Sequence, residues 1–109
     1  MVDDSIIRGF LSSLRTIDDI IIIPTYKNRR TRYRLGITVN DQEDMIRNLR
    51  IEEYIKGPIE DHDSFRQSKL WVFKHNYCGT MIYIKITEKQ IINDSGSVRA
   101  LSCHIDNML

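Results

Sequence analysis

The sequence predicts an α+β fold in which N-terminal helices pack on one face of a mainly antiparallel sheet. Apolar residues recur at helical spacing in the first half of the chain and alternate with polar residues in the second half. Turn-forming residues separate the alternating segments, as they do between strands of a meander. Because the 109 residues contain no linker-like stretch rich in Gly, Ser or Pro, we expect residues 1–109 to form a single domain.

Three helices are expected, at Ser5–Thr16, Asn28–Leu35 and residues 40–50. Gly36 follows the second segment directly, and a glycine there can take the left-handed conformation that ends many helices. Asn40 and Glu43 have the spacing of a capping box at the start of the third segment. The buried stripe expected for this third helix is Met45, Ile46 and Leu49.

The expected strands are Ile20–Ile23, Glu53–Lys56, Lys69–His75, Met81–Glu88 and Val98–Ile105. Pro24 ends the first strand, Gly57-Pro58 ends the second, and the polar residues 60–68 form a connecting loop. Apolar residues occupy both faces of the third strand, so this strand is expected to be buried on both sides. Its aromatic pair, Trp71 and Phe73, therefore predicts core packing rather than stacking on bases.

The face of the sheet turned away from the helices is expected to collect polar side chains. The Met81–Glu88 strand puts its isoleucines on one face, which must meet the helices, and Tyr83 and Lys85 on the other. If Leu101, Cys103 and Ile105 of the last strand also turn inward, Ser102 and His104 lie on the same open face. The Tyr54/Lys56 pair is expected to join them. The open face then gathers Lys56, Tyr83, Lys85 and His104.

These four side chains suit cleavage of an RNA phosphodiester. The reaction needs a base for the 2′-hydroxyl proton, an acid for the departing oxygen and positive charge on the developing phosphorane. His, Lys and Tyr can fill these roles, and each positioned proton transfer contributes about 10²–10⁴-fold. Such a mechanism requires no metal and no cofactor. The alternative interpretation of a Tyr-x-Lys pattern is an ordinary solvated strand face.

Several segments resemble, in order, the conserved blocks of MqsR-type toxins, and together they cover about residues 17–104. They are Leu35–Thr38, Glu53–Pro58, Leu70–Phe73, Gly79–Ile86 and Arg99–His104. The most specific element is Tyr83-Ile84-Lys85 after a glycine turn. The chain departs from the family where Val72 replaces a glutamine and Cys103 replaces a phenylalanine.

The resemblance implies a RelE-like fold and an mRNA endoribonuclease, acting on the ribosome or on free mRNA. It would be the toxin of a type II toxin–antitoxin system, located in the cytoplasm and neutralised by an antitoxin encoded next to it. Lys56 and Tyr83 match functional positions of the family, and His104 stands where the family carries lysine or histidine.

A basic run lies between the first and third helices and consists of Lys27, Arg29, Arg30, Arg32 and Arg34. It contains no acidic residue, which favours contact with an RNA backbone over a solvated helix face. It could equally dock an acidic segment of the antitoxin. Tyr33, within the run, and Tyr77, in a loop between two expected strands, are candidates for stacking on bases.

Other residue patterns favour unremarkable roles. The cysteines and histidines lack the spacing of a zinc site, because Cys103 and His104 point to opposite faces of their strand. We therefore expect no metal, and a small core residue at Cys103. Asp61, His62 and Asp63 could form a general-base cluster, but a solvated loop is favoured.

Composition excludes several classes of protein. No apolar run approaches the ~20 residues of a membrane span, and the acidic start at Met1–Asp4 predicts no secretory signal. A net charge of +1 argues against binding nucleic acid by bulk charge. Two alternatives to the nuclease stay open: a non-catalytic module that binds RNA or protein, and a related toxin that acts on gyrase.

Overall fold

The computed structural model of the protein describes residues 2–60, 69–92 and 94–108. Its helices are α1 (Asp4–Thr16), α2 (Tyr26–Leu35) and α3 (Val39–Arg47), and α3 is followed by a short 3-10 helix, η1 (Ile51–Glu53). Its strands are β1 (Asp19–Ile22), β2 (Tyr54–Glu60), β3 (Lys69–Tyr77), β4 (Thr80–Thr87), β5 (Gln90–Ile92) and β6 (Ser95–Ile105).

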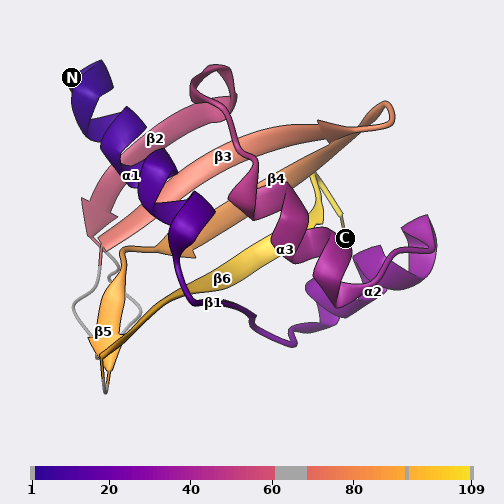
Figure 1. Ribbon diagram of the computed structural model, residues 1–109. Helices are drawn as coiled ribbons and strands as arrows, with labels where there is room; N and C mark the ends of the chain where they lie inside the picture. Colours follow the sequence, from indigo (N-terminus) through magenta and orange to yellow (C-terminus); the bar gives the residue numbers. More distant parts are fainter. Residues whose placement is uncertain (1, 61–68, 93, 109) are drawn as a thin grey trace.

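The strands form one mixed sheet in the order β1-β6-β4-β3-β2, with β5 paired to β6. All pairings are antiparallel except β1 with β6, which is parallel. Figure 1 shows α1 and α3 on the same side of this sheet, while α2 lies beside the C-terminal part of β6. The α+β class is confirmed, with a mixed sheet in the described residues. No helix in the described part of the chain is long and apolar enough to cross a membrane.

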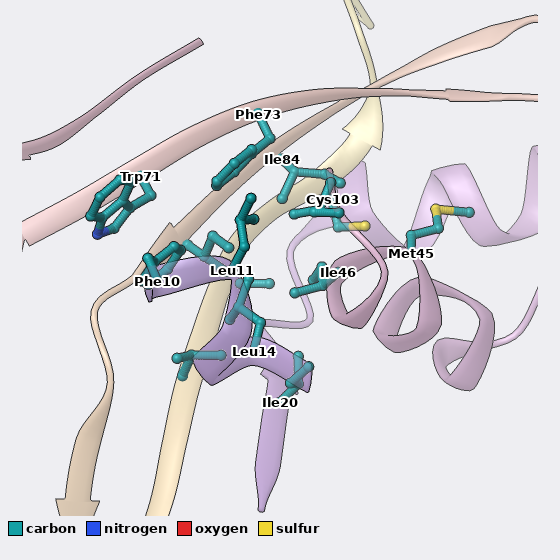
Figure 2. Close-up of a cluster of buried hydrophobic side chains, with 14 of the residues drawn as sticks. Phe10, Leu11, Leu14, Ile20, Met45, Ile46, Trp71, Phe73, Ile84 and Cys103 are labelled. Carbon is teal, nitrogen blue, oxygen red and sulfur yellow. The ribbon is translucent and has the colours of Figure 1, made fainter. Parts of the chain in front are cut away.

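The core fills the space between the sheet and α1 and α3 (Figure 2). The Phe10 ring of α1 stacks on Trp71 of β3 with 4.3 Å between ring centroids and 6° between the planes. Trp71 and Phe73 are buried on this face, and Leu70 and Val72 are buried on the other, as expected. Cys103 is fully buried in the same core, which confirms it as a core residue.

The helix ends follow local capping chemistry. α2 ends at Gly36, whose φ of 64° is left-handed as expected. The capping box predicted for α3 was wrong. Thr38 and Asp41 form it instead: the Thr38 hydroxyl accepts from the Asp41 N–H at 3.1 Å and the Asp41 carboxylate from the Thr38 N–H at 2.8 Å. The helix also ends earlier, at Arg47, although Leu49 beyond it is buried as predicted.

The strand bounds differ from the prediction: β6 begins at Ser95 instead of Val98, β3 ends at Tyr77 instead of His75, and β1 and β4 are each shifted by one residue toward the N-terminus. β2 does not stop before Gly57-Pro58 but continues through them to Glu60, with two irregularities in its pairing to β3. The short strand β5 was missed, because Gln90–Ile92 shows no alternation and pairs only with the start of β6. The predicted loop at residues 60–68 lies, apart from Glu60, outside the described residues.

The edge of β6 beyond β1 is closed by side chains. β1 pairs with β6 only over Ser97–Ala100. Past that point, the Asn28 amide accepts from the Cys103 N–H at 2.8 Å and donates to the Leu101 carbonyl at 3.2 Å. Gln42 of α3 donates to the Cys103 carbonyl at 2.8 Å, and Thr31 accepts from the Ile105 N–H at 2.9 Å.

This closure holds α2 on the sheet. Asn28 and Gln42 are fully buried, and the Asn28 amide also donates to the Ile23 carbonyl at 2.8 Å. The Gln42 side-chain amide also donates to the backbone carbonyl of Asn28 at 3.2 Å, which ties α3 to α2. A buried backbone group left without a partner costs about 1–3 kcal/mol, so the network stabilises the fold chiefly because removing any member is expensive.

We expect Asn28→Ala to lower the free energy of unfolding by about 3 kcal/mol or more. The substitution leaves buried backbone groups of Ile23, Leu101 and Cys103 without a hydrogen-bond partner. Urea denaturation measures this loss. Arg29→Ala, at the exposed neighbouring position, is the matched control and should change the stability by less than about 0.5 kcal/mol. A loss below about 1 kcal/mol for Asn28→Ala would show that the network does not hold α2 in place.

Candidate functional site

The candidate site lies on the face of the sheet opposite α1 and α3. The strand register places its residues in two neighbouring cross-strand rows. One row joins Lys56, Val72, Lys85 and Ser102, and the next joins Lys74, Tyr83 and His104. Cross-strand neighbours in register share one face of the sheet. The four predicted residues Lys56, Tyr83, Lys85 and His104 are therefore brought together on this face.

Tyr83 and His104 are direct cross-strand neighbours on this face. Their rings are directly opposite on β4 and β6, with 5.5 Å between centroids. The Nδ1 atom of His104 lies 2.9 Å from the Ile105 carbonyl oxygen. Since a carbonyl only accepts, this nitrogen carries the hydrogen, and the neutral ring keeps its lone pair on Nε2.

The position of Lys56 depends on an irregularity in β2. Tyr54 pairs with Phe73 and Lys56 with Val72, so one residue on β3 is matched by two on β2. The prediction that Tyr54 shares the open face with Lys56 was therefore wrong. The Tyr54 ring packs edge-on against Trp71 and Phe73 in the core, and its hydroxyl donates to the Gly57 carbonyl at 2.5 Å. A bulge re-aims one side chain relative to its neighbour.

A second irregularity shifts the phase of β6. Lys85 pairs with Ser102, but Ile86 pairs with Ala100, which leaves Leu101 without an opposite residue. Ala100 is consequently buried in the core, and Leu101 is only half-buried, contrary to the predicted alternation. Cys103 and His104 keep their predicted faces because they follow the bulge.

Two cations of the open face were missed at the sequence level. Lys74 is in the row of Tyr83, and its Nζ is 3.0 Å from an Asp106 carboxylate oxygen. Arg99 precedes the β6 bulge and pairs with the exposed Ile21 of β1. If every second residue before His104 faced the open side, Ala100 would lie there. The bulge shifts this alternation by one residue and places Arg99 on the open face instead. Under these polar side chains, Leu70 and Val72 form a buried apolar floor.

The basic run occupies α2 and is divided by its helical positions. Lys27, Arg30 and Arg34 recur at i, i+3 and i+7 and are exposed along one flank. None of the basic residues of the run has a carboxylate within ion-pair distance among the described residues. Arg32 is set apart, because it is half-buried and its guanidinium donates to Gln42 Oε1 at 2.9 Å.

Aromatic side chains accompany these cations. Tyr26 and Tyr33 are 65% and 81% exposed, which is unusual for side chains of this size. The Arg30 guanidinium lies 5.7 Å from the centre of the Tyr33 ring, within range of a cation–π contact. Exposed tyrosines beside free cations offer both stacking and phosphate contacts to a nucleic acid strand.

The buried cysteine, Cys103, shows no chemistry of its own. Burial raises the pKa of the Cys103 thiol from 9.0 to about 12, against a smaller lowering by the charge of Arg32. This thiol is therefore neutral at physiological pH and is neither a nucleophile nor a metal ligand. Among residues 2–60, 69–92 and 94–108, no three His, Cys, Asp or Glu side chains gather as a metal site would require. Asp61, His62 and Asp63 lie outside the described residues.

No protein-family model, no curated protein and no solved structure matches this chain. What the site can do is therefore argued from its own geometry.

The strain that any larger residue would introduce at Gly57, beside Lys56, can be tested. A Cβ there would lie 2.7 Å from the Leu70 carbonyl oxygen and 2.8 Å from the Trp71 Cα, and φ is 126°. Gly79, at φ 90°, is the matched control because nothing lies within 4 Å of its Cβ position. We expect Gly79→Ala to cost about 1–2 kcal/mol of folding free energy and Gly57→Ala clearly more, since backbone must move. Equal losses in thermal denaturation would contradict the close packing of β2 on β3.

Proposed function

We propose that this protein is a metal-independent endoribonuclease that cleaves mRNA, the toxin of a type II toxin–antitoxin system with a RelE-like fold. The observation that carries the proposal is the Tyr83–His104 pair on the sheet face opposite α1 and α3, next to the row that holds Lys56 and Lys85. Proton-transfer groups and positive charge are thus side by side, as cleavage of a phosphodiester requires.

His104 suits the role of general base. Because its Nδ1–H is held by the Ile105 carbonyl, Nε2 is the nitrogen that takes the proton from the RNA 2′-hydroxyl. The 2′-oxygen then attacks phosphorus, the bond to the 5′-oxygen breaks, and the products are a 2′,3′-cyclic phosphate and a 5′-hydroxyl. The 5′-oxygen receives its proton from Tyr83 or from Lys85.

Positive charge on the open face would stabilise the dianionic phosphorane. Lys56 and Lys85 are in one cross-strand row, and Arg99 extends the cationic surface toward β1. None of the three has a carboxylate within ion-pair distance among the described residues, so their charge is available to a phosphate. The Lys74 charge, in contrast, is balanced by Asp106.

The basic flank of α2, formed by Lys27, Arg30 and Arg34, would bind the RNA backbone beside the site. α2 is attached to β6, the strand that carries His104, through Asn28 and Thr31. RNA lying across the open face could therefore place one phosphate between Tyr83 and His104 while Lys27 and Arg34 contact others. The resemblance of the sequence to MqsR-type toxins supports the same function, an mRNA endoribonuclease, and implies an antitoxin partner in the cytoplasm.

Cleavage is expected in EDTA, with new ends that carry 2′,3′-cyclic phosphate, because no step uses a metal. His104→Ala and Tyr83→Phe should each lower the cleavage rate by about 10²–10⁴-fold. Gel analysis of a labelled RNA with end-group mapping measures both. Tyr77→Phe is the matched control, because it removes the same phenolic hydroxyl from a tyrosine of β3 whose ring packs against the core. This variant should retain the parent rate.

The outcomes separate the candidate functions. Full activity in both variants would remove Tyr83 and His104 from the mechanism. RNA binding without turnover, and expression without growth arrest, would favour the non-catalytic module. Growth arrest without RNA cleavage would favour a toxin with another target, such as gyrase.

RNA affinity should depend on salt through the α2 flank. Lys27→Ala combined with Arg34→Ala should reduce the slope of log affinity against log salt by about 0.7 for each lost phosphate contact. Lys69→Ala combined with Lys89→Ala removes the same charge from two other exposed positions and is the control. Fluorescence anisotropy with an uncleavable RNA gives the slopes, and equal slopes in the two double variants would exclude α2 from the interface.

A further inference from the structure

A pocket of about 310 Å³ lies on the helix side of the molecule, away from the Tyr83–His104 face. It is formed between α1 and the segment that leads from α3 into η1. On α1, Arg8, Ser12 and Arg15 are spaced i, i+4 and i+7, so they follow one stripe along the pocket. Arg50 comes from the facing segment.

Three guanidinium groups line the pocket, and among the described residues only that of Arg50 has a carboxylate within ion-pair distance, at 3.8 Å from Glu53. Within the described residues, neither Arg8 nor Arg15 has a carboxylate within ion-pair distance. Arg47, a neighbour in sequence, differs, because its guanidinium donates to the Leu14 and Ile17 carbonyls and thereby caps α1. Arg8 and Arg15 are thus left for a ligand, whereas Arg50 also faces Glu53.

Arg50 is held in place at its backbone. Its N–H donates to Glu53 Oε1 at 2.9 Å, and its Nε lies 3.8 Å from the same oxygen. The other Glu53 oxygen is 2.5 Å from His75 Nδ1 on β3. Glu53 is itself buried, so it fixes the start of η1 against the sheet, while the Arg50 side chain stays 72% exposed.

The remaining lining residues define the kind of ligand. Leu11 and Ile51 contribute apolar surface, Ser12 offers a hydroxyl, and Glu52 offers hydrogen-bond acceptors. Planar guanidinium groups match the oxygens of a phosphate, whereas Glu52 would repel a second phosphate and accept from a hydroxyl. The volume is at the small end of the roughly 300–1,000 Å³ that small-molecule sites occupy.

We propose that this pocket binds a small monophosphate with a hydroxyl-bearing body, the chemistry shared by sugar phosphates and nucleoside monophosphates. The phosphate contacts Arg8, Arg15 and Arg50, the body packs on Leu11 and Ile51, and Glu52 accepts from its hydroxyls. The proposal does not depend on RNA cleavage, since none of these residues is on the open sheet face.

Titrations of the full chain with AMP, ribose 5-phosphate and adenosine, followed by amide NMR, test the proposal. We expect the two phosphates, but not adenosine, to shift amides of residues 8–15 and 50–52. The stronger of the two phosphates identifies whether the body is a sugar or a nucleoside. Arg8→Ala combined with Arg15→Ala should weaken binding by about tenfold or more. Lys69→Ala combined with Lys89→Ala, with the same loss of charge, should leave it unchanged.

A third variant tests the orientation of the ligand. Glu52→Gln should weaken ribose 5-phosphate without weakening inorganic phosphate, because only the former presents hydroxyls. Three results would overturn the proposal: no shifts at up to about 10 mM ligand, where a millimolar Kd is visible; binding of adenosine equal to that of AMP; or shifts confined to α2 and β6. Because all substituted side chains are exposed, the variants should fold, and their parent-like NMR spectra would verify it. Loss of RNA cleavage with phosphate binding intact would refute the proposed function alone.

Discussion

The arrangement of the molecule depends on how the edge of β6 is satisfied after β1 ends. β1 is short, and its pairing stops at Ala100, while β6 runs on to Ile105. The N–H and C=O groups beyond that point need partners, because they are shielded from water by α2 and α3. An amide side chain both donates and accepts, so Asn28 can stand in for a strand residue at this edge. Gln42 does the same from the helix side.

This closure couples the two proposed functional surfaces. Along β6, Cys103 turns to the core and is held at its backbone by Asn28, and His104 turns to the open face one residue later. The helix that supplies the bond also carries the basic run. His104, the proposed base, and the basic flank of α2, the proposed phosphate-binding surface, are therefore fixed to the same strand. A helix attached only by apolar contacts would have more freedom to shift along β6.

The sequence was informative where a strand is regular and uninformative where pairing is irregular. Alternation placed Tyr83 and Lys85 correctly because β4 has no bulge within that segment. It failed for Tyr54 and Ala100, because a bulge arises from the fit of two strands and leaves no period in either one. The burial of Asn28 could not be predicted from the sequence either. A polar residue among arginines is expected to be exposed, and Asn28 is buried because it bonds the open edge of β6.

The distribution of bonds explains how a chain of net charge +1 can present cationic surfaces. Four of its 15 carboxylates accept hydrogen bonds from backbone N–H groups. Asp3 accepts from the Ser5 N–H, Asp41 from Thr38, Glu53 from Arg50 and Asp18 from Gly96. A carboxylate held by an N–H at a helix start stabilises that helix end and is less able to neutralise a distant guanidinium. The arginines of α2 and α1 keep their charge for solvent or a ligand. The proposed attraction for phosphate is therefore local, and a net charge of +1, which averages over the whole chain, does not reveal it.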